Sequence, residues 1–156
     1  MSSFLVAGCR TPIGKLCGTL SSWTAPQLGA AVVRDVLRRA GLAPEQVDEV
    51  VMGDVLQAGL GQAPARQAAL GAGLPPTVSA LTVNMMCGSG LRAVMLADAA
   101  IRAGTARCIV AGGMESMTRA PHLLVGTRSG WKYGHQQAVD SMIADGLWCA
   151  FENQAM

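Results

Sequence analysis

The chain has 156 residues, enough for one domain with a hydrophobic core of its own. Apolar residues make up 51% of it and charged residues 14%, which excludes intrinsic disorder and leaves few side chains suited to a solvated surface. The net charge is +2 without a basic cluster, so no nucleic-acid partner is expected, and no long uncharged apolar run predicts a membrane span.

Strands and helices are predicted to alternate along the first part of the chain. Thr24 is a suitable N-cap for a first helix, and Pro26 is tolerated in its first turn. Gly41 ends this helix. The alternation indicates a layered α/β fold with a mainly parallel sheet. In chain order the predicted elements are a strand over 4–7, a helix over 24–41, a strand over 49–56, a helix over 64–70, a strand over 81–86, a helix over 89–103 and a strand over 108–111.

The regular pattern breaks after Met117. Residues 118–139 contain scattered charges, one proline and three glycines, without a helical or strand period. A helix is predicted again over 140–151. We therefore expect a core domain over 1–117 and an excursion from it, the start of a second domain, over 118–156.

One cysteine stands between a predicted strand and a predicted helix, in the stretch VNMMCGSGLRAV. The N-terminus of the helix directs free backbone N–H groups and a partial positive charge at Cys87, which favours its thiolate form. The helix after it is apolar around most of its circumference, which predicts that it is buried. Gly88 and Gly90 are expected to keep the approach to sulfur open, and the N–H groups of the turn can hold an oxyanion. From these residues alone, Cys87 is either a nucleophile or a small core residue in a glycine turn.

The other candidate residues have more ordinary interpretations. The cysteines form no CxxC pairs and no dense framework, which favours a reducing compartment over a disulfide-bonded protein and indicates no metal site. Cys108 is expected to fill the core. Glu115 and Ser116 are expected to brace the nucleophile's loop by hydrogen bonds, and His135 to be solvated. The N-terminus has neither the basic lead of a signal peptide nor the Arg-rich character of a mitochondrial presequence.

Several motifs together resemble the N-terminal part of the thiolases, the acetyl-CoA acetyltransferase and 3-ketoacyl-CoA thiolase family. They are RTPIG at 10–14, GQAPARQAALGAGLP at 61–75, VNMMCGSGLRAV at 83–94, AGGMESMTRAPH at 111–122 and DGLWCAFENQAM at 145–156. The segment around Cys87 resembles the family's nucleophile signature. The resemblance implies a thiolase-like N-terminal half, with 118–156 as the beginning of the loop domain that covers the active site and holds coenzyme A.

By this resemblance Cys87 accepts an acyl group from acyl-CoA as a thioester, and Claisen condensation or thiolysis follows with a second substrate. Coenzyme A thioesters are then the substrates, with no separate cofactor and no metal. Met156 is expected at the acyl pocket, although Ala155 precedes it where the family commonly has histidine. Arg128 and Lys132 are expected to be solvated or at a subunit contact rather than at coenzyme A phosphates. His122 is expected to be structural.

The family's histidine base and second cysteine match no motif of this chain. The chain is therefore expected to be a fragment or one piece of a split enzyme, inactive alone, whose partner is a C-terminal thiolase half or subunit. A cytoplasmic homo-oligomer is expected. Two alternatives remain open: a non-catalytic thiolase-like module that binds acyl-CoA or a partner subunit, and a condensing enzyme of the ketoacyl synthase type. The RTPIG and GGMESM motifs favour a thiolase over the latter.

Overall fold

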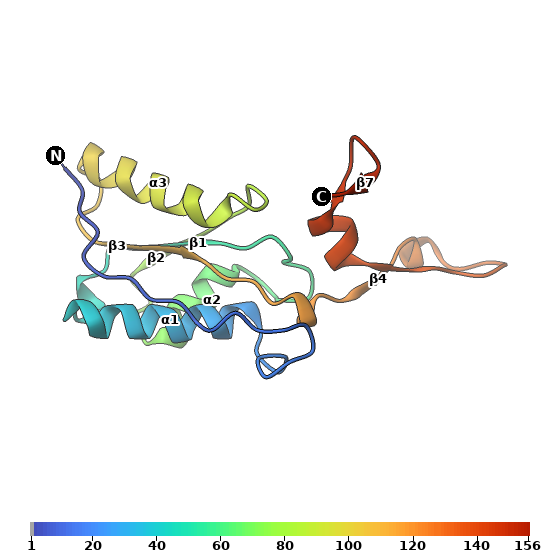
Figure 1. Ribbon diagram of the computed structural model, residues 1–156, viewed down its shortest axis with the longest axis horizontal. Coiled ribbons are helices and arrows are strands. Elements are labelled where there is room, and N and C mark those ends of the chain that lie inside the picture. Colours follow the sequence, from blue (N-terminus) through green and yellow to red (C-terminus); the bar gives the residue numbers. More distant parts are fainter. Residues whose placement is uncertain (1) are drawn as a thin grey trace.

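A computed structural model describes residues 2–156 and shows a layered α/β core from which the C-terminal segment extends (Figure 1). None of the helices within residues 2–156 combines the length and the apolar character that a membrane-spanning helix requires. The elements of the core, in chain order, are α1 Ala25–Ala40, η1 Pro44–Gln46, β1 Glu49–Gly53, α2 Pro64–Ala72, β2 Ser79–Val83, α3 Ser89–Ala103 and β3 Ile109–Gly113.

The core sheet has three parallel strands in the order β2-β1-β3. Val51 in the middle of β1 pairs with Leu81 of β2 on one side and with Ala111 of β3 on the other. Figure 1 shows α3 on one face of the sheet and α1 with α2 on the other. The crossovers from β1 to β2 and from β2 to β3 run in opposite directions along the sheet, so right-handed connections place α2 and α3 on opposite faces. The α/β prediction is confirmed.

The hydrophobic core lies mainly between the sheet and the α1–α2 layer. Val50 and Met52 of β1 are 0% and 1% exposed and pack in one cluster with Val33 and Leu37 of α1. On the other face of the sheet, α3 presents small residues, and Ala93 is its most deeply buried side chain at 0% exposure. The central strand β1 is thus buried on both faces, which explains its continuous apolar sequence VVM.

The helix boundaries follow local capping signals. The Thr24 side chain accepts a hydrogen bond from the Gln27 N–H, and the Gln27 side chain accepts one from the Thr24 N–H, so the two form a capping box. Gly41 ends α1 in the left-handed region at φ +65°. Gly104 ends α3 in the same way. The predictions for these two helices are confirmed.

The predicted strand over 4–7 is wrong. This stretch is extended but belongs to no sheet, and Phe4, Leu5 and Val6 are 83%, 90% and 73% exposed. A cavity of about 440 Å³ lies between the segment, α1, α3 and the free edge of β3. Paired strands lie about 4.8 Å apart with nothing between them. Because a cavity lies between this segment and β3, the backbone groups of the segment have no strand partner.

The prediction that α3 is buried around most of its circumference is also wrong. Only Ser89, Ala93 and Ala97 are buried, whereas Leu91 is 68% and Met95 51% exposed. The sheet covers one face of α3, and among residues 2–156 no element covers the opposite one. The low charge fraction of the chain therefore appears on its surface as exposed apolar side chains.

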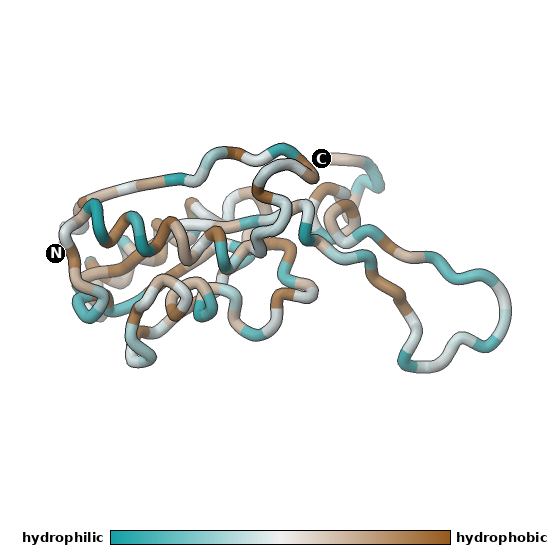
Figure 2. The backbone as a smooth tube through the Cα atoms, turned by 90° about the horizontal axis from the view of Figure 1, so that it is seen from below, coloured by the Kyte–Doolittle hydropathy of each residue, from teal (hydrophilic) through white to brown (hydrophobic). Residues whose placement is uncertain are grey.

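After the core, the chain forms short elements that project away from it (Figure 1). The β4–β5 pair is an antiparallel hairpin, so the prediction of an irregular segment over 118–139 missed it. The helix predicted over 140–151 is found as a shorter π-helical stretch. Figure 2 shows the loop of the hairpin extended and largely hydrophilic. These elements are η2 Met117–Arg119, β4 His122–Leu124, η3 Thr127–Ser129, β5 Ala138–Asp140, η4 Met142–Leu147, β6 Trp148–Cys149 and β7 Gln154–Ala155.

Candidate active site

Cys87 lies in the turn that joins β2 to α3. β2 ends at Val83 and α3 begins at Ser89, which confirms the predicted strand–turn–helix arrangement although the strand is shorter than expected. The turn is at the carboxyl end of a parallel sheet, the place where open α/β sheets bind their ligands. Cys87 is exposed. Its thiol can therefore meet a substrate from solvent.

A serine at the start of α3 fixes the shape of this turn. The Ser89 hydroxyl accepts a hydrogen bond from the Met85 N–H at 2.8 Å and donates one to the Met86 carbonyl at 2.5 Å. The Ser89 N–H donates to the same carbonyl at 3.0 Å. Met86 itself has φ +49°, a left-handed conformation that residues with a side chain seldom adopt. The hydrogen bonds of Ser89 hold Met86 in it, and Met86 sets the direction in which Cys87 leaves the turn.

Glycines let the first turn of α3 lie directly against the sheet. A Cβ on Gly90 would face the backbone of Gly112 and Gly113 at 3.9 Å. A Cβ on Gly53, the last residue of β1, would lie only 2.6 Å from the Ser89 carbonyl carbon. Gly90 lies against the sheet, where a Cβ would make only ordinary contact, and the expectation that Gly90 keeps the approach to sulfur open stays a prediction. Gly53 was missed by the sequence analysis because it lies far from Cys87 along the chain.

Glu115 braces the loop that follows β1. Its two carboxylate oxygens accept hydrogen bonds from the N–H groups of Val55 and Leu56, each at 3.0 Å. The Ser116 hydroxyl donates to the Trp23 carbonyl at 2.8 Å. Both residues act through hydrogen bonds, as predicted, but the loops that they hold are those around 55 and 23 rather than the loop of the nucleophile.

A buried acid next to Glu115 was not anticipated. Asp54 follows Gly53 directly and is 1% exposed. Burial, with the adjoining Glu115 carboxylate, raises the pKa of Asp54 to about 8. In the sequence, Asp54 stands directly after an apolar strand, a position where polar residues are commonly exposed. Its burial could therefore not be predicted.

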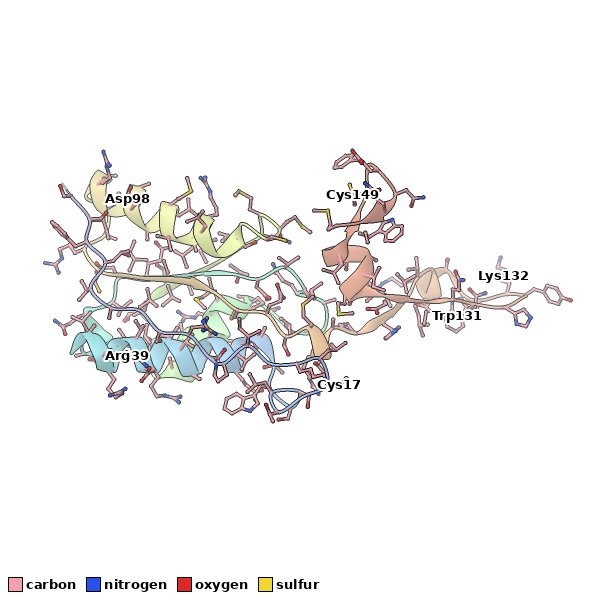
Figure 3. All side chains as sticks on the ribbon, in the orientation of Figure 1. Cys17, Arg39, Asp98, Trp131, Lys132 and Cys149 are labelled. Carbon is pink, nitrogen blue, oxygen red and sulfur yellow. The ribbon has the colours of Figure 1, made fainter. Side chains whose placement is uncertain are left out.

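The remaining sequence candidates are not brought to Cys87 by hydrogen bonds. His122 lies in β4 and His135 in the hairpin loop, both exposed, and within residues 2–156 neither makes a side-chain hydrogen bond. Met156 is 77% exposed, and its N–H donates to the Leu147 carbonyl at 2.9 Å. Lys132, in the loop between β4 and β5, is exposed and points away from the core (Figure 3). Arg128 in η3 is exposed as well.

The partly buried cysteines are poor competitors as nucleophiles. The Cys9 thiol donates to the Val32 carbonyl, and burial raises its pKa. Burial, together with the Asp48 carboxylate, likewise raises the pKa of Cys108, which packs against the core as predicted. Cys17 and Cys149 are also free thiols (Figure 3). Cys87 differs from all of them because it is exposed directly before a 15-residue helix, at the end where the helix dipole is positive.

Comparison with known proteins gives a consistent result. The family model described as "Thiolase, N-terminal domain" matches residues 3–156. The chain is 55% identical over 152 residues to an acetyl-CoA acetyltransferase of Cupriavidus necator and 54% identical over 152 residues to one of Pseudomonas aeruginosa. It is 54% identical over 155 residues to a probable acetyl-CoA acetyltransferase of Mycobacterium leprae. These alignments cover 97%, 97% and 99% of the chain, and in each case 39% of the relative.

Proposed function

Since the chain belongs to the thiolase family, we propose that it carries the nucleophile of an acetyl-CoA acetyltransferase and that Cys87 is the residue that takes the acyl group. The observation that supports this most directly is the exposed thiol of Cys87 at the N-terminus of α3, at the carboxyl edge of the parallel sheet. The names of the relatives support acetyl-CoA as the substrate class.

The proposed first step is an acyl transfer to sulfur. The Cys87 thiolate attacks the carbonyl carbon of acetyl-CoA, and the carbonyl electron pair moves onto oxygen to give a tetrahedral oxyanion. We propose that backbone N–H groups at the start of α3 stabilise this charge. The oxyanion then collapses, the bond to the coenzyme A sulfur breaks, and coenzyme A leaves as a thiolate that takes up a proton. The product is an acetyl thioester on Cys87.

In the second step, the α-carbon of another acetyl-CoA, after losing a proton, would attack the thioester and release the Cys87 thiolate; thiolysis is the reverse. A base must remove that α-proton. Within residues 2–156, neither histidine is hydrogen-bonded to the turn of Cys87, so we assign this base to residues of the whole enzyme other than His122 and His135. Met156 is proposed to line the acyl pocket. Coenzyme A thioesters serve as substrates, and the chemistry calls for no resident cofactor.

We further propose that the chain works together with a C-terminal thiolase half or subunit and as part of a homo-oligomer. Apolar side chains of α3, notably Leu91 and Met95, are exposed, which supports the proposal that another domain or subunit covers this face of α3. The five free cysteines support a reducing compartment, for which we propose the cytoplasm. The alternative is a module that binds acyl-CoA without transferring its acyl group. The observation in its favour is that, within residues 2–156, neither histidine is hydrogen-bonded to the Cys87 turn.

Intact-mass spectrometry after incubation with acetyl-CoA tests the proposal. We expect the chain to gain the mass of one acetyl group, mapped to Cys87 by peptide analysis and lost in Cys87→Ala. Cys17→Ala is the matched control because it removes another exposed thiol, and it should acetylate normally. Saturable binding of acetyl-CoA without any thioester would favour the binding module. Acetylation of Cys17 in place of Cys87 would contradict the assignment.

A further inference from the structure

The carboxyl group of Asp54 is enclosed without a hydrogen-bond donor. Its side chain is 1% exposed, and within residues 2–156 both of its oxygens are buried and accept no hydrogen bond. An ionised carboxylate in such a place carries a large desolvation penalty that nothing nearby offsets. A neutral carboxyl group avoids most of that penalty, and it gains a hydrogen atom that it can donate.

Glu115 provides the acceptor for that hydrogen atom. Burial acts first, and the Glu115 carboxylate adds to it both by hydrogen bonding and by charge, to favour the protonated form of Asp54 and raise its pKa to about 8. Glu115 in turn accepts hydrogen bonds from the N–H groups of Val55 and Leu56, each at 3.0 Å, and these hold its carboxylate beside the residue that precedes Val55, which is Asp54. The surroundings of Asp54 therefore favour a proton on its own carboxyl group, with Glu115 as the neighbouring acceptor.

No other ionisable group takes part in this arrangement. Nearby elements also carry Arg92 on α3, Cys87 in the turn before it, and Asp145 on η4, whose neighbour Gly146 lies against Leu56. In the described part of the chain, Arg92 and Asp145 form no salt bridge. Among residues 2–156, no lysine, arginine or histidine forms an ion pair with Asp54 or Glu115. A proton is thus the one positive charge that the described surroundings offer to the pair.

The acid pair lies where the ends of all three core strands meet. The Asp54 N–H donates to the Val83 carbonyl of β2 at 3.0 Å, and the Met114 N–H after β3 donates to the Gly53 carbonyl of β1 at 2.9 Å. Gly53, next to Asp54, is the residue against which the backbone of Ser89 packs, two residues after Cys87. A shift of the Asp54 backbone is therefore transmitted both to the end of β2 and to the start of α3, the two sides of the Cys87 turn.

We propose that Asp54 and Glu115 share one proton and that the shared proton positions the turn of Cys87 by holding the ends of β1, β2 and β3 together. Asp54 is then a positioning residue. Its importance for acyl transfer rests on the proposed function, whereas the shared proton itself does not. When the proton is lost in alkaline solution, two carboxylates face each other in a buried site, and their repulsion loosens the loop at 54–56 and the turn beside it.

Infrared difference spectroscopy of the intact chain tests the shared proton directly. At neutral pH the exposed carboxyl groups are ionised, so we expect the C=O band of a single protonated carboxyl group, which disappears as the pH rises through about 8. Asp54→Asn should lose the band, because its amide donates to Glu115 without titrating. Glu45→Gln, which makes the same acid-to-amide change at an exposed position, should keep it.

The positioning role is tested by the pH profile of Cys87 alkylation, followed by peptide mass mapping. We expect the native chain to show a second inflection at the pH where the infrared band disappears, and Asp54→Asn to follow a single thiol ionisation. The native spectrum alone keeps the inference falsifiable if the variant does not fold. Three results would overturn the shared proton. They are a native spectrum without a protonated-carboxyl band, a band that survives in Asp54→Asn, and a native chain that lacks the band but is stabilised by sodium or potassium ions. Matching alkylation profiles in both proteins would overturn the positioning role. Failure of acetyl transfer with the band present would count against the proposed function alone.

Discussion

Replacing Gly53 by alanine should disturb the Cys87 turn from beneath. An alanine Cβ at this position would lie 2.6 Å from the Ser89 carbonyl carbon and 2.7 Å from the Gly90 nitrogen. Both are backbone atoms, so no side-chain rotation relieves the clash, and β1 and the first turn of α3 must separate by about 0.8 Å to reach ordinary contact. Gly53 does not have a positive φ, so the whole effect is steric.

Overpacking of this kind costs about 1 to 3 kcal/mol. For a domain of this size that corresponds to a fall in Tm of roughly 2 to 12 °C. Because the displaced atoms belong to the residues after Cys87, the rate of Cys87 alkylation should change as well. Thermal unfolding followed by circular dichroism gives the first quantity, and timed alkylation with peptide mapping gives the second.

Gly112→Ala is the matched control for this experiment. Gly112 lies on the neighbouring strand, paired with Met52, and its added Cβ would meet only the Met52 thioether, with the sulfur at 3.7 Å. We expect unchanged stability or a gain of about 0.4 to 1 kcal/mol from the stiffer unfolded chain, and no change at Cys87. If Gly53→Ala were as stable as Gly112→Ala and its Cys87 reacted at the native rate, the close packing of β1 against α3 would not support the turn as we describe.

Four further predictions concern the buried acid, the thiols, the apolar surface of α3 and catalysis. Asp54→Asn should gain stability relative to the native chain as pH rises toward about 8, by on the order of 1 kcal/mol per pH unit. The reason is that a folded-state pKa raised to about 8 stabilises the native chain in acid, and this stabilisation is lost as pH rises to that value, whereas asparagine does not titrate. Denaturant titrations at several pH values measure the difference. Cys87 should be alkylated before Cys17 in the folded chain, since only Cys87 stands at a helix N-terminus, and the order of modification in mass maps decides this. The chain should self-associate through apolar side chains such as Leu91 and Met95, and a monodisperse monomer in sedimentation at tens of micromolar concentration would contradict that. The 156-residue polypeptide alone should show no measurable acetoacetyl-CoA thiolysis, because a nucleophile without its base loses several orders of magnitude in rate; robust turnover that Cys87→Ala abolishes would refute the assignment of the base to other residues.

Local signals were sufficient for the helices and for the nucleophile turn. Thr24 and Gly41 bound α1, and Gly104 ends α3, because capping residues act on backbone groups within one turn of themselves. The position of Cys87 between a strand and a helix could be predicted for the same reason. The motifs around it also indicated the thiolase family, which the comparisons confirm for residues 3–156.

Predictions that required knowledge of neighbours in space were less successful. Residues 4–7 have the composition of a strand, yet a strand exists only with a partner, and a cavity separates this segment from β3. The apolar sequence of α3 predicted burial, but burial depends on what lies against each face, and the sheet covers only the face of Ala93 and Ala97. The hairpin of β4 and β5 has too few residues in each strand to show a period of two.

The sequence by itself determined where the chain turns, which residues cap its helices, and which cysteine stands at a helix N-terminus, because each of these depends on residues a few positions apart. Only the tertiary structure decided that Asp54 is buried against Glu115, whose carboxylate reaches back some 60 residues along the chain to the N–H groups of Val55 and Leu56. It likewise decided that Gly53 supports the backbone of Ser89. Whether an acid is protonated depends on the dielectric and the charges around it, and whether a position tolerates a methyl group depends on the free volume there. Both are set by residues that lie far apart in the sequence and that the strand order β2-β1-β3 brings together.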